Sequence, residues 1–126
     1  MNDSKPEWVI NKVKLAIADF LQANPDKTVK EIILACYGLA FKPNIDDLRE
    51  SPALEITRNI AKLHAGTVMA VEPNIRQLPS DFENVELASF DNACNFADIH
   101  ILLVDHDEFK SVTVTSDYII DTKGIW

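Results

Sequence analysis

The stretch VKEIILACYGLAF, residues 29–41, is an almost continuous run of apolar side chains. Its length and its lack of polar alternation are typical of a strand that is buried on both faces. Such strands occur in parallel sheets whose two faces are covered by helices. We therefore predict that residues 29–41 form a central strand of an α/β protein.

Helix and strand signals alternate outward from this run. Before it, residues 5–23 repeat apolar side chains with a helical period, and Ser4 and Glu7 have capping-box spacing. After it, Ser51 followed by Pro52 is a helix-start signal. The remaining expected elements are a helix from Ser51 ended by Gly66, strands at 67–73, 85–88, 99–106 and 118–121, a short helix at 89–98, and a helical turn from Asp107.

This alternating order predicts a Rossmann-like three-layer α/β sandwich. We expect a mostly parallel sheet of about five strands, with helices on both faces and a helix before it. A chain of 126 residues is long enough for one domain with one core. We expect a single domain over residues 1–126, with a lead-in helix at 1–25 and the α/β domain at 28–126.

Composition restricts the class of protein. The formal net charge is −8, which argues against nucleic acid as a partner because binding it needs a basic surface. The chain has no run of about 18 apolar residues, so we expect no membrane span. The start MNDSKPEWVINK lacks the pattern of a secretory signal, and we expect a cytoplasmic protein.

In parallel α/β sheets, ligands bind beyond the carboxyl ends of the strands. The segments expected at that edge are 41–50, Glu72-Pro73, Asp105-His106 and 121–123. Neither G-x-G-x-x-G nor G-x-x-x-x-G-K-[ST] occurs in the sequence. The charged loop 41–50 is either a phosphate site with Lys42 as a point charge or a solvated loop whose charges pair locally. Lys123, in front of Gly124, either faces the same edge or is a surface lysine.

No catalytic residue and no metal site are predicted from the residues alone. His100 lies inside an apolar strand and is expected to be a buried, hydrogen-bonded imidazole. His106 has acidic neighbours, but no second His or Cys stands at ligand spacing. Cys36 and Cys94 lie in apolar segments and are expected to be buried, reduced, unreactive thiols, although a single disulfide stays open as an alternative.

Residues 38–52, GLAFKPNIDDLRESP, resemble the start of the C-terminal domain of the nucleotide-sugar 6-dehydrogenases, the UDP-glucose/GDP-mannose dehydrogenase family. VEPN at 71–74 is similar to the ending of that domain's second strand. LLVDHDEFK at 102–110 and DTKGIW at 121–126 resemble the branch of the family that oxidises UDP-N-acetyl-D-mannosamine. The UDP-glucose branch usually carries a segment like Asp-Gly-Arg-Asn here, and this chain does not.

The resemblance implies an enzyme that oxidises the C6 alcohol of the sugar to a carboxylate in two NAD-dependent steps. The product would be UDP-N-acetyl-D-mannosaminuronate, for surface polysaccharide synthesis. The resemblance also implies that Phe41, Lys42 and Lys123 bind the UDP-sugar. Arg49 matches a family position that reaches the NAD held by a separate N-terminal domain.

Parts of the family pattern have no counterpart in this sequence. The catalytic cysteine in its Gly-Gly-His-Cys context, the NAD-binding fingerprint and the central domain are all missing. We therefore expect the C-terminal third of a dehydrogenase, excised or from a natural short gene, that is inactive alone. Its expected partners are the UDP-sugar, the enzyme's own NAD-binding and central domains, and further copies in a homo-oligomer. Two alternatives stay open: the same domain of a UDP-glucose 6-dehydrogenase, and a stand-alone non-catalytic nucleotide-binding or assembly module.

Overall fold

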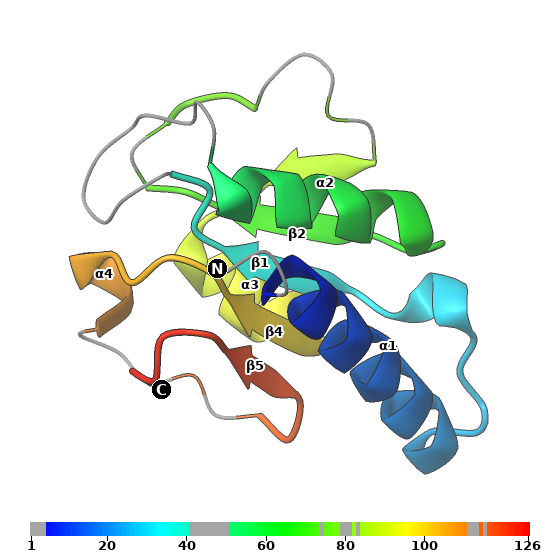
Figure 1. Cartoon of the computed structure of the whole chain (residues 1–126). Coiled ribbons are helices and arrows are strands. Elements are labelled where there is room, and N and C mark those ends of the chain that lie inside the picture. The colour runs from blue at the N-terminus through cyan, green and yellow to red at the C-terminus, as the bar shows by residue number, and fades with distance from the viewer. Residues whose placement is uncertain are drawn as a thin grey trace.

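The computed structural model describes residues 5–40, 51–73, 75–78, 82, 84–110, 114 and 116–126. Within them, five parallel strands form one sheet in the order β3-β2-β1-β4-β5 (Figure 1). This architecture confirms the predicted Rossmann-like fold. The strands are β1 Leu34–Tyr37, β2 Val68–Val71, β3 Val85–Leu87, β4 Ile99–Leu102 and β5 Ile119–Asp121.

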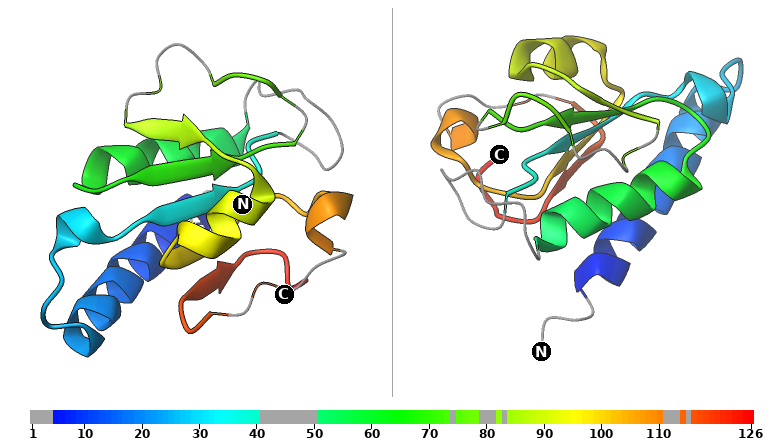
Figure 2. Two further views of the ribbon diagram at one scale, coloured as in Figure 1. Left: turned by 180° about the vertical axis from the view of Figure 1, so that it is seen from behind. Right: turned by 90° about the horizontal axis from the view of Figure 1, so that it is seen from above.

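Helices cover both faces of the sheet, as Figure 2 shows from above and behind. α1 and α2 pack together on one face, and α3 lies on the other, while α4 follows β4 near the carboxyl edge. The bounds are α1 Lys5–Ala23, α2 Pro52–Leu63, α3 Phe90–Phe96 and α4 Asp107–Lys110, with a 3₁₀ turn at Val29–Glu31.

The central strand β1 is buried on both faces because its side chains alternate between two apolar clusters. Leu34 and Cys36 join the cluster under α1 and α2, whereas Ala35 and Tyr37 join the cluster under α3. All four side chains are fully buried. Period-2 alternation into two covered faces explains why the sequence shows no polar alternation along this strand.

The predicted helix starts at Lys5 and at Ser51-Pro52 are confirmed, whereas Ser4 of the predicted capping box lies outside the described residues. One predicted helix end is wrong. Ser51 caps α2, and its Oγ accepts a hydrogen bond from the Leu54 backbone N–H at 3.2 Å. The helix ends with His64 as its C-cap, so Gly66 is not the capping glycine. Position 66 requires glycine for a steric reason, because a Cβ there would lie 2.7 Å from the Ile32 carbonyl oxygen.

The apolar run 29–41 is longer than the strand that it forms. Its first residues make the 3₁₀ turn, where the Glu31 carboxylate accepts a hydrogen bond from the Thr28 backbone N–H at 2.8 Å. At the other end the backbone turns at Gly38, which has φ +99°. Likewise, β4 ends at Leu102, well before the predicted residue 106.

Candidate functional site at the carboxyl edge

The four strands β1, β2, β4 and β5 end at one edge of the sheet because all of them run parallel. Their paired last residues are Tyr37 with Val71, and Leu102 with both Tyr37 and Asp121. This is the edge at which α/β sheets bind ligands. The segments predicted to share it are therefore brought together wherever the structure describes them.

A buried carboxylate joins three of these strand ends. Glu72 follows β2, and its Oε1 accepts hydrogen bonds from the backbone N–H groups of Leu39 at 2.8 Å and Ala40 at 3.1 Å. The Nε2 atom of His106 lies 2.9 Å from the same oxygen, and both side chains are inaccessible to solvent. Because the carboxylate is an acceptor, the imidazole donates through Nε2. Glu72 thus ties the ends of β1, β2 and β4 together.

The backbone of Leu39 is held on both sides. Its N–H donates to Glu72, and its carbonyl accepts a 2.7 Å hydrogen bond from the Ser51 hydroxyl. Leu39 lies just before residues 41–50, and Ser51 lies just after them. The two points where that charged segment enters and leaves the fold are therefore fixed by short, buried hydrogen bonds.

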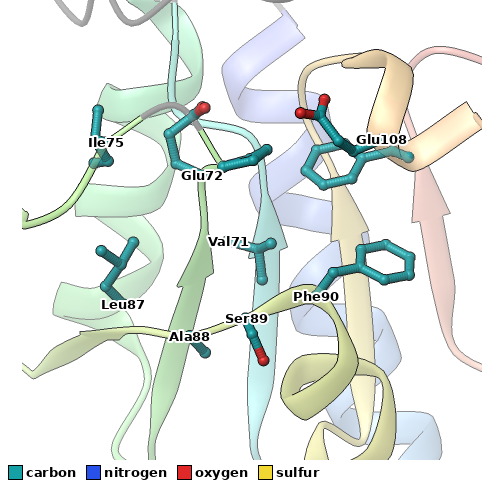
Figure 3. A pocket seen from close by; sticks show the side chains of 10 residues that line it. Val71, Glu72, Ile75, Leu87, Ala88, Ser89, Phe90 and Glu108 are labelled. Atoms are coloured by element: carbon teal, nitrogen blue, oxygen red, sulfur yellow. The ribbon is translucent and has the colours of Figure 1, made fainter.

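A pocket of about 450 Å³ opens beside this edge on the α3 face. Figure 3 shows the acidic side chains Glu72 and Glu108 on one side of it and the apolar side chains Leu87 and Phe90 on the other. The volume is within the range of small-ligand sites.

Of the predicted ligand residues, Lys123 is described, and it lies two residues beyond the end of β5 at the carboxyl edge. Its side chain is exposed, and among the described residues it has no ion-pair partner. The hydroxyl of Thr122 donates to the Leu102 carbonyl at 2.8 Å, which holds this segment against β4. Phe41, Lys42 and Arg49 lie outside the described residues.

Asp121, at the end of β5, holds the backbone around Lys123. Its Oδ1 accepts the N–H groups of Lys123 at 2.9 Å and Gly124 at 2.7 Å, and its Oδ2 accepts that of Trp126 at 2.8 Å. Burial alone would raise the pKa of this carboxyl group, but the backbone donors outweigh burial and lower its pKa. The carboxylate therefore stays ionised as the centre of a tight turn.

The remaining histidine and cysteine predictions concern the interior. His100 is buried, as predicted, and its Nδ1 lies 2.7 Å from the Tyr37 hydroxyl. Both cysteines are free thiols; Cys36 is buried, but Cys94 is half-buried. Burial raises the pKa of Cys36 to about 12, partly offset by a hydrogen bond with Thr57, and burial also raises the pKa of Cys94. Neither thiol has the lowered pKa of a nucleophile.

Glu72 and Asp121 were predicted to lie at this edge, but not to organise it as hydrogen-bond acceptors. Each is an acidic residue at the end of a strand, which is the sequence signal that could have pointed to them. Among the described residues, no three His, Cys, Asp or Glu side chains are grouped so as to hold a metal ion. Every helix in the described part of the chain is too short or too polar to cross a bilayer.

Residues 35–126 match the UDP binding domain of the UDP-glucose/GDP-mannose dehydrogenase family. The chain belongs to this family. The match begins inside β1 and continues to Trp126, so it includes the whole carboxyl edge. The family resemblance predicted from residues 38–52 is thereby confirmed.

Three curated relatives are named as dehydrogenases of N-acetylated nucleotide sugars. The chain is 53% identical to the UDP-N-acetyl-D-mannosamine dehydrogenase of Salmonella typhi over 130 aligned residues, and 52% identical to that of Escherichia coli K12. The NDP-N-acetyl-D-galactosaminuronic acid dehydrogenase of Ralstonia solanacearum is 46% identical. Each alignment covers all of this chain, but it covers 31%, 31% and 28%, respectively, of the relative.

Solved structures of the family share the fold. The UDP-N-acetyl-mannosamine dehydrogenase from S. aureus superposes with a TM-score of 0.71 at 26% identity, over 98% of this chain and 28% of that protein. The UDP-D-ManNAc dehydrogenase from Pyrococcus horikoshii gives 0.71 at 27% identity, over 99% and 28%. The chain therefore spans less than a third of the length of these relatives.

Proposed function

We propose that this chain is the C-terminal, UDP-sugar-binding part of an NAD-dependent UDP-N-acetyl-D-mannosamine 6-dehydrogenase. The observation that carries the proposal is the 53% identity over the whole chain to a UDP-N-acetyl-D-mannosamine dehydrogenase. The complete enzyme would oxidise C6 of the sugar to the carboxylate, for surface polysaccharide synthesis in the cytoplasm.

The ligand contacts of this part of the enzyme lie at the carboxyl edge. Lys123 supplies an exposed cation there, on a turn held by the Asp121 carboxylate. Phe41 and Lys42 follow directly after Ala40, whose N–H is bonded to Glu72. We assign these three residues to the UDP-sugar, and Arg49 to the NAD that the rest of the enzyme would hold.

The residues of this chain do not fit NAD as a resident cofactor. A dinucleotide site needs a glycine-rich turn after its first strand and an acidic side chain that reaches the ribose. Here Gly38 is the only glycine in residues 1–65. The acidic side chain after β2, Glu72, points inward and is bonded to Leu39, Ala40 and His106. NAD, which accepts the hydride in this chemistry, is therefore assigned to the part of the enzyme that this chain lacks.

The proposal also implies that the chain alone does not oxidise a sugar. Its two thiols have raised pKa values, and Cys36 is buried in the core. Neither can serve as the thiolate that such a dehydrogenase needs. Purified chain with NAD and UDP-N-acetyl-D-mannosamine should give no NADH absorbance at 340 nm, and turnover would refute this assignment.

We assign the outer face of α1 to contacts with the rest of the enzyme or with other copies in a homo-oligomer. Trp8 is 45% exposed and Leu15 is 60% exposed, and the two lie seven residues apart on one side of the helix. Lys12, between them, places its Nζ 5.6 Å from the centre of the Trp8 ring. Large exposed apolar side chains of this kind often mark a contact surface.

An NMR titration of the isotope-labelled chain tests the ligand assignment. UDP should shift the amide signals of Lys42, Lys123 and Gly124, whereas NAD should shift them little. A Kd near the millimolar range is expected, because the rest of the cleft is absent. Lys123→Ala should weaken UDP binding. The matched control is Lys110→Ala, which removes a lysine that is paired with Asp107 near the same edge.

The outcomes separate the candidate functions. Shifts with UDP that depend on Lys123 support a substrate-binding domain. No response of this edge to several millimolar UDP would refute binding by the chain alone and would favour an assembly module. Stronger shifts with NAD than with UDP would reverse the assignment of the two ligands.

A further inference from the structure

The six residues 121–126 form a turn that is organised around one carboxylate. Asp121 accepts three backbone N–H groups, two through Oδ1 and one through Oδ2, at 2.7–2.9 Å. Gly124 takes a left-handed φ of +75°, which the turn requires and which favours glycine. An acceptor with two oxygens is needed here, because the donors reach both sides of the carboxylate.

The far end of this turn is anchored in the aromatic cluster of the α3 face. The Trp126 indole N–H donates to the Phe109 carbonyl at 2.9 Å. Its ring meets Tyr37 edge-on, with the ring centroids 4.9 Å apart, and also contacts Phe90. The turn is therefore tied to β5 at one end and to the core at the other.

Lys123 lies between these two anchors. Its backbone N–H is one of the three that Asp121 accepts, and its neighbour Thr122 is bonded to the Leu102 carbonyl. Its side chain is exposed at the carboxyl edge. The turn thus fixes the backbone of Lys123 by hydrogen bonds, while its side chain stays exposed. Holding the backbone in advance lowers the entropy cost of binding.

We infer that Asp121 is a positioning residue for ligand binding, which holds the 121–126 turn so that Lys123 faces the phosphate groups of a nucleoside diphosphate. The inference rests on the proposed function, because it takes UDP as the ligand of Lys123. Asp121 itself does not touch the ligand. Its effect on binding passes through the backbone of Lys123.

The sign of the effect of Asp121→Asn distinguishes positioning from simple electrostatics. Removing a negative charge close to a diphosphate should strengthen binding if charge alone mattered. Positioning predicts the opposite, because asparagine keeps only one acceptor oxygen, so backbone N–H donors on one side of the turn lose their acceptor. We expect Asp121→Asn to weaken UDP binding about fivefold, and Lys123→Ala to weaken it about five- to tenfold.

The charge control is Asp107→Asn, which removes an exposed carboxylate of α4 near the same edge. This variant should bind UDP as tightly as the wild type or slightly more tightly. The double variant Asp121→Asn/Lys123→Ala should bind UDP at most about twofold more weakly than Lys123→Ala alone, because both changes act on the same interaction, that of Lys123 with the ligand.

Amide hydrogen exchange without ligand examines the turn separately. Asp121→Asn should speed the exchange of the Lys123, Gly124 and Trp126 amides and leave the β1 amides unchanged. A merely structural role would lower the melting temperature without weakening the UDP affinity of the folded protein.

Each contrary result has a distinct meaning. UDP binding by Asp121→Asn that is as tight as the wild type, or additive losses in the double variant, would overturn the positioning role and leave the proposed function intact. If Lys123→Ala binds UDP normally, both the Lys123 contact and the positioning role are wrong. If the wild type shows no response to UDP, ligand binding and this inference fail together, and the exchange data then report on the turn alone.

Discussion

Substitution of Gly38 tests how closely the backbone after β1 approaches Val104 at the carboxyl edge. Gly38 follows β1 with φ +99°, and a Cβ there would lie 2.5 Å from the Val104 Cβ and 2.9 Å from the Val104 backbone nitrogen. Gly38→Ala therefore meets two penalties. The left-handed backbone costs an alanine about 1–2 kcal/mol, and the overpacking costs about 1–3 kcal/mol more.

The matched control is Gly124→Ala. Gly124 also has a left-handed φ, +75°, but a Cβ there would meet no atom within 4 Å. It should show the backbone penalty alone, about 1–2 kcal/mol. Any stabilisation from the lower entropy of an unfolded chain with alanine applies to both variants. The difference between them, about 1–3 kcal/mol, is therefore the steric penalty at Val104.

Urea denaturation followed by circular dichroism gives the free energy of unfolding for both variants. The m-values should match the wild type, so that the midpoints report stability. Val104→Ala should not rescue Gly38→Ala, since the nearest Cβ atom and the backbone nitrogen remain. Free energies for the two glycine variants that agree within about 0.5 kcal/mol would refute the close approach of β1 to Val104.

Three further predictions concern buried polar groups. Glu72→Gln should lower the free energy of unfolding by about 1–3 kcal/mol, whereas Glu86→Gln, at the exposed position of β3, should change it by less than about 0.5 kcal/mol. Equal effects in urea denaturation would contradict the buried hydrogen bonds of Glu72. Burial raises the pKa of Cys36 to about 12 and also raises that of Tyr37, so the unfolded chain loses these protons first. Stability should be fully present below about pH 9 and fall above it, and Cys36→Ala should reduce the fall by up to about 1.4 kcal/mol per pH unit; unchanged pH dependence would contradict this. At pH 8, iodoacetamide should slowly label half-buried Cys94 and spare Cys36, and rapid labelling of Cys36 in mass spectra would contradict its burial.

The helices and the alternation of helix and strand along the chain could be predicted because their signals are local. The apolar period of residues 5–23 and the Ser51-Pro52 pair each mark an element without reference to the rest of the chain. The strand ends could not be predicted in this way. Leu39, Leu103 and Val104 are apolar and buried like strand residues, but they lie beyond the ladders of β1 and β4. Their burial comes from tertiary packing around the carboxyl edge, which a pattern of apolar residues does not separate from pairing.

The candidate site shows the same limit for polar residues. Lys123 could be placed at the carboxyl edge from strand order alone. Glu72 could not be recognised as a structural acceptor, because its donors are backbone N–H groups whose positions depend on the fold, whereas the donors of Asp121 lie two to five residues after it, in a local turn. For Glu72, those donors lie more than 30 residues away in the sequence.

The acidic net charge of −8 is compatible with an anionic ligand at this edge. Glu72 and Asp121 both point their oxygens at backbone donors, so part of their charge is compensated where it lies. Charges elsewhere on the surface are screened over about 8–10 Å at physiological salt. A nucleic acid contacts many phosphates over a long surface and so depends on the overall charge. A diphosphate has two phosphate groups, and its affinity depends on the few donors and cations within a few ångströms. The net charge therefore argues against a polyanion as partner, whereas the affinity for a small anion depends on the placement of Lys123.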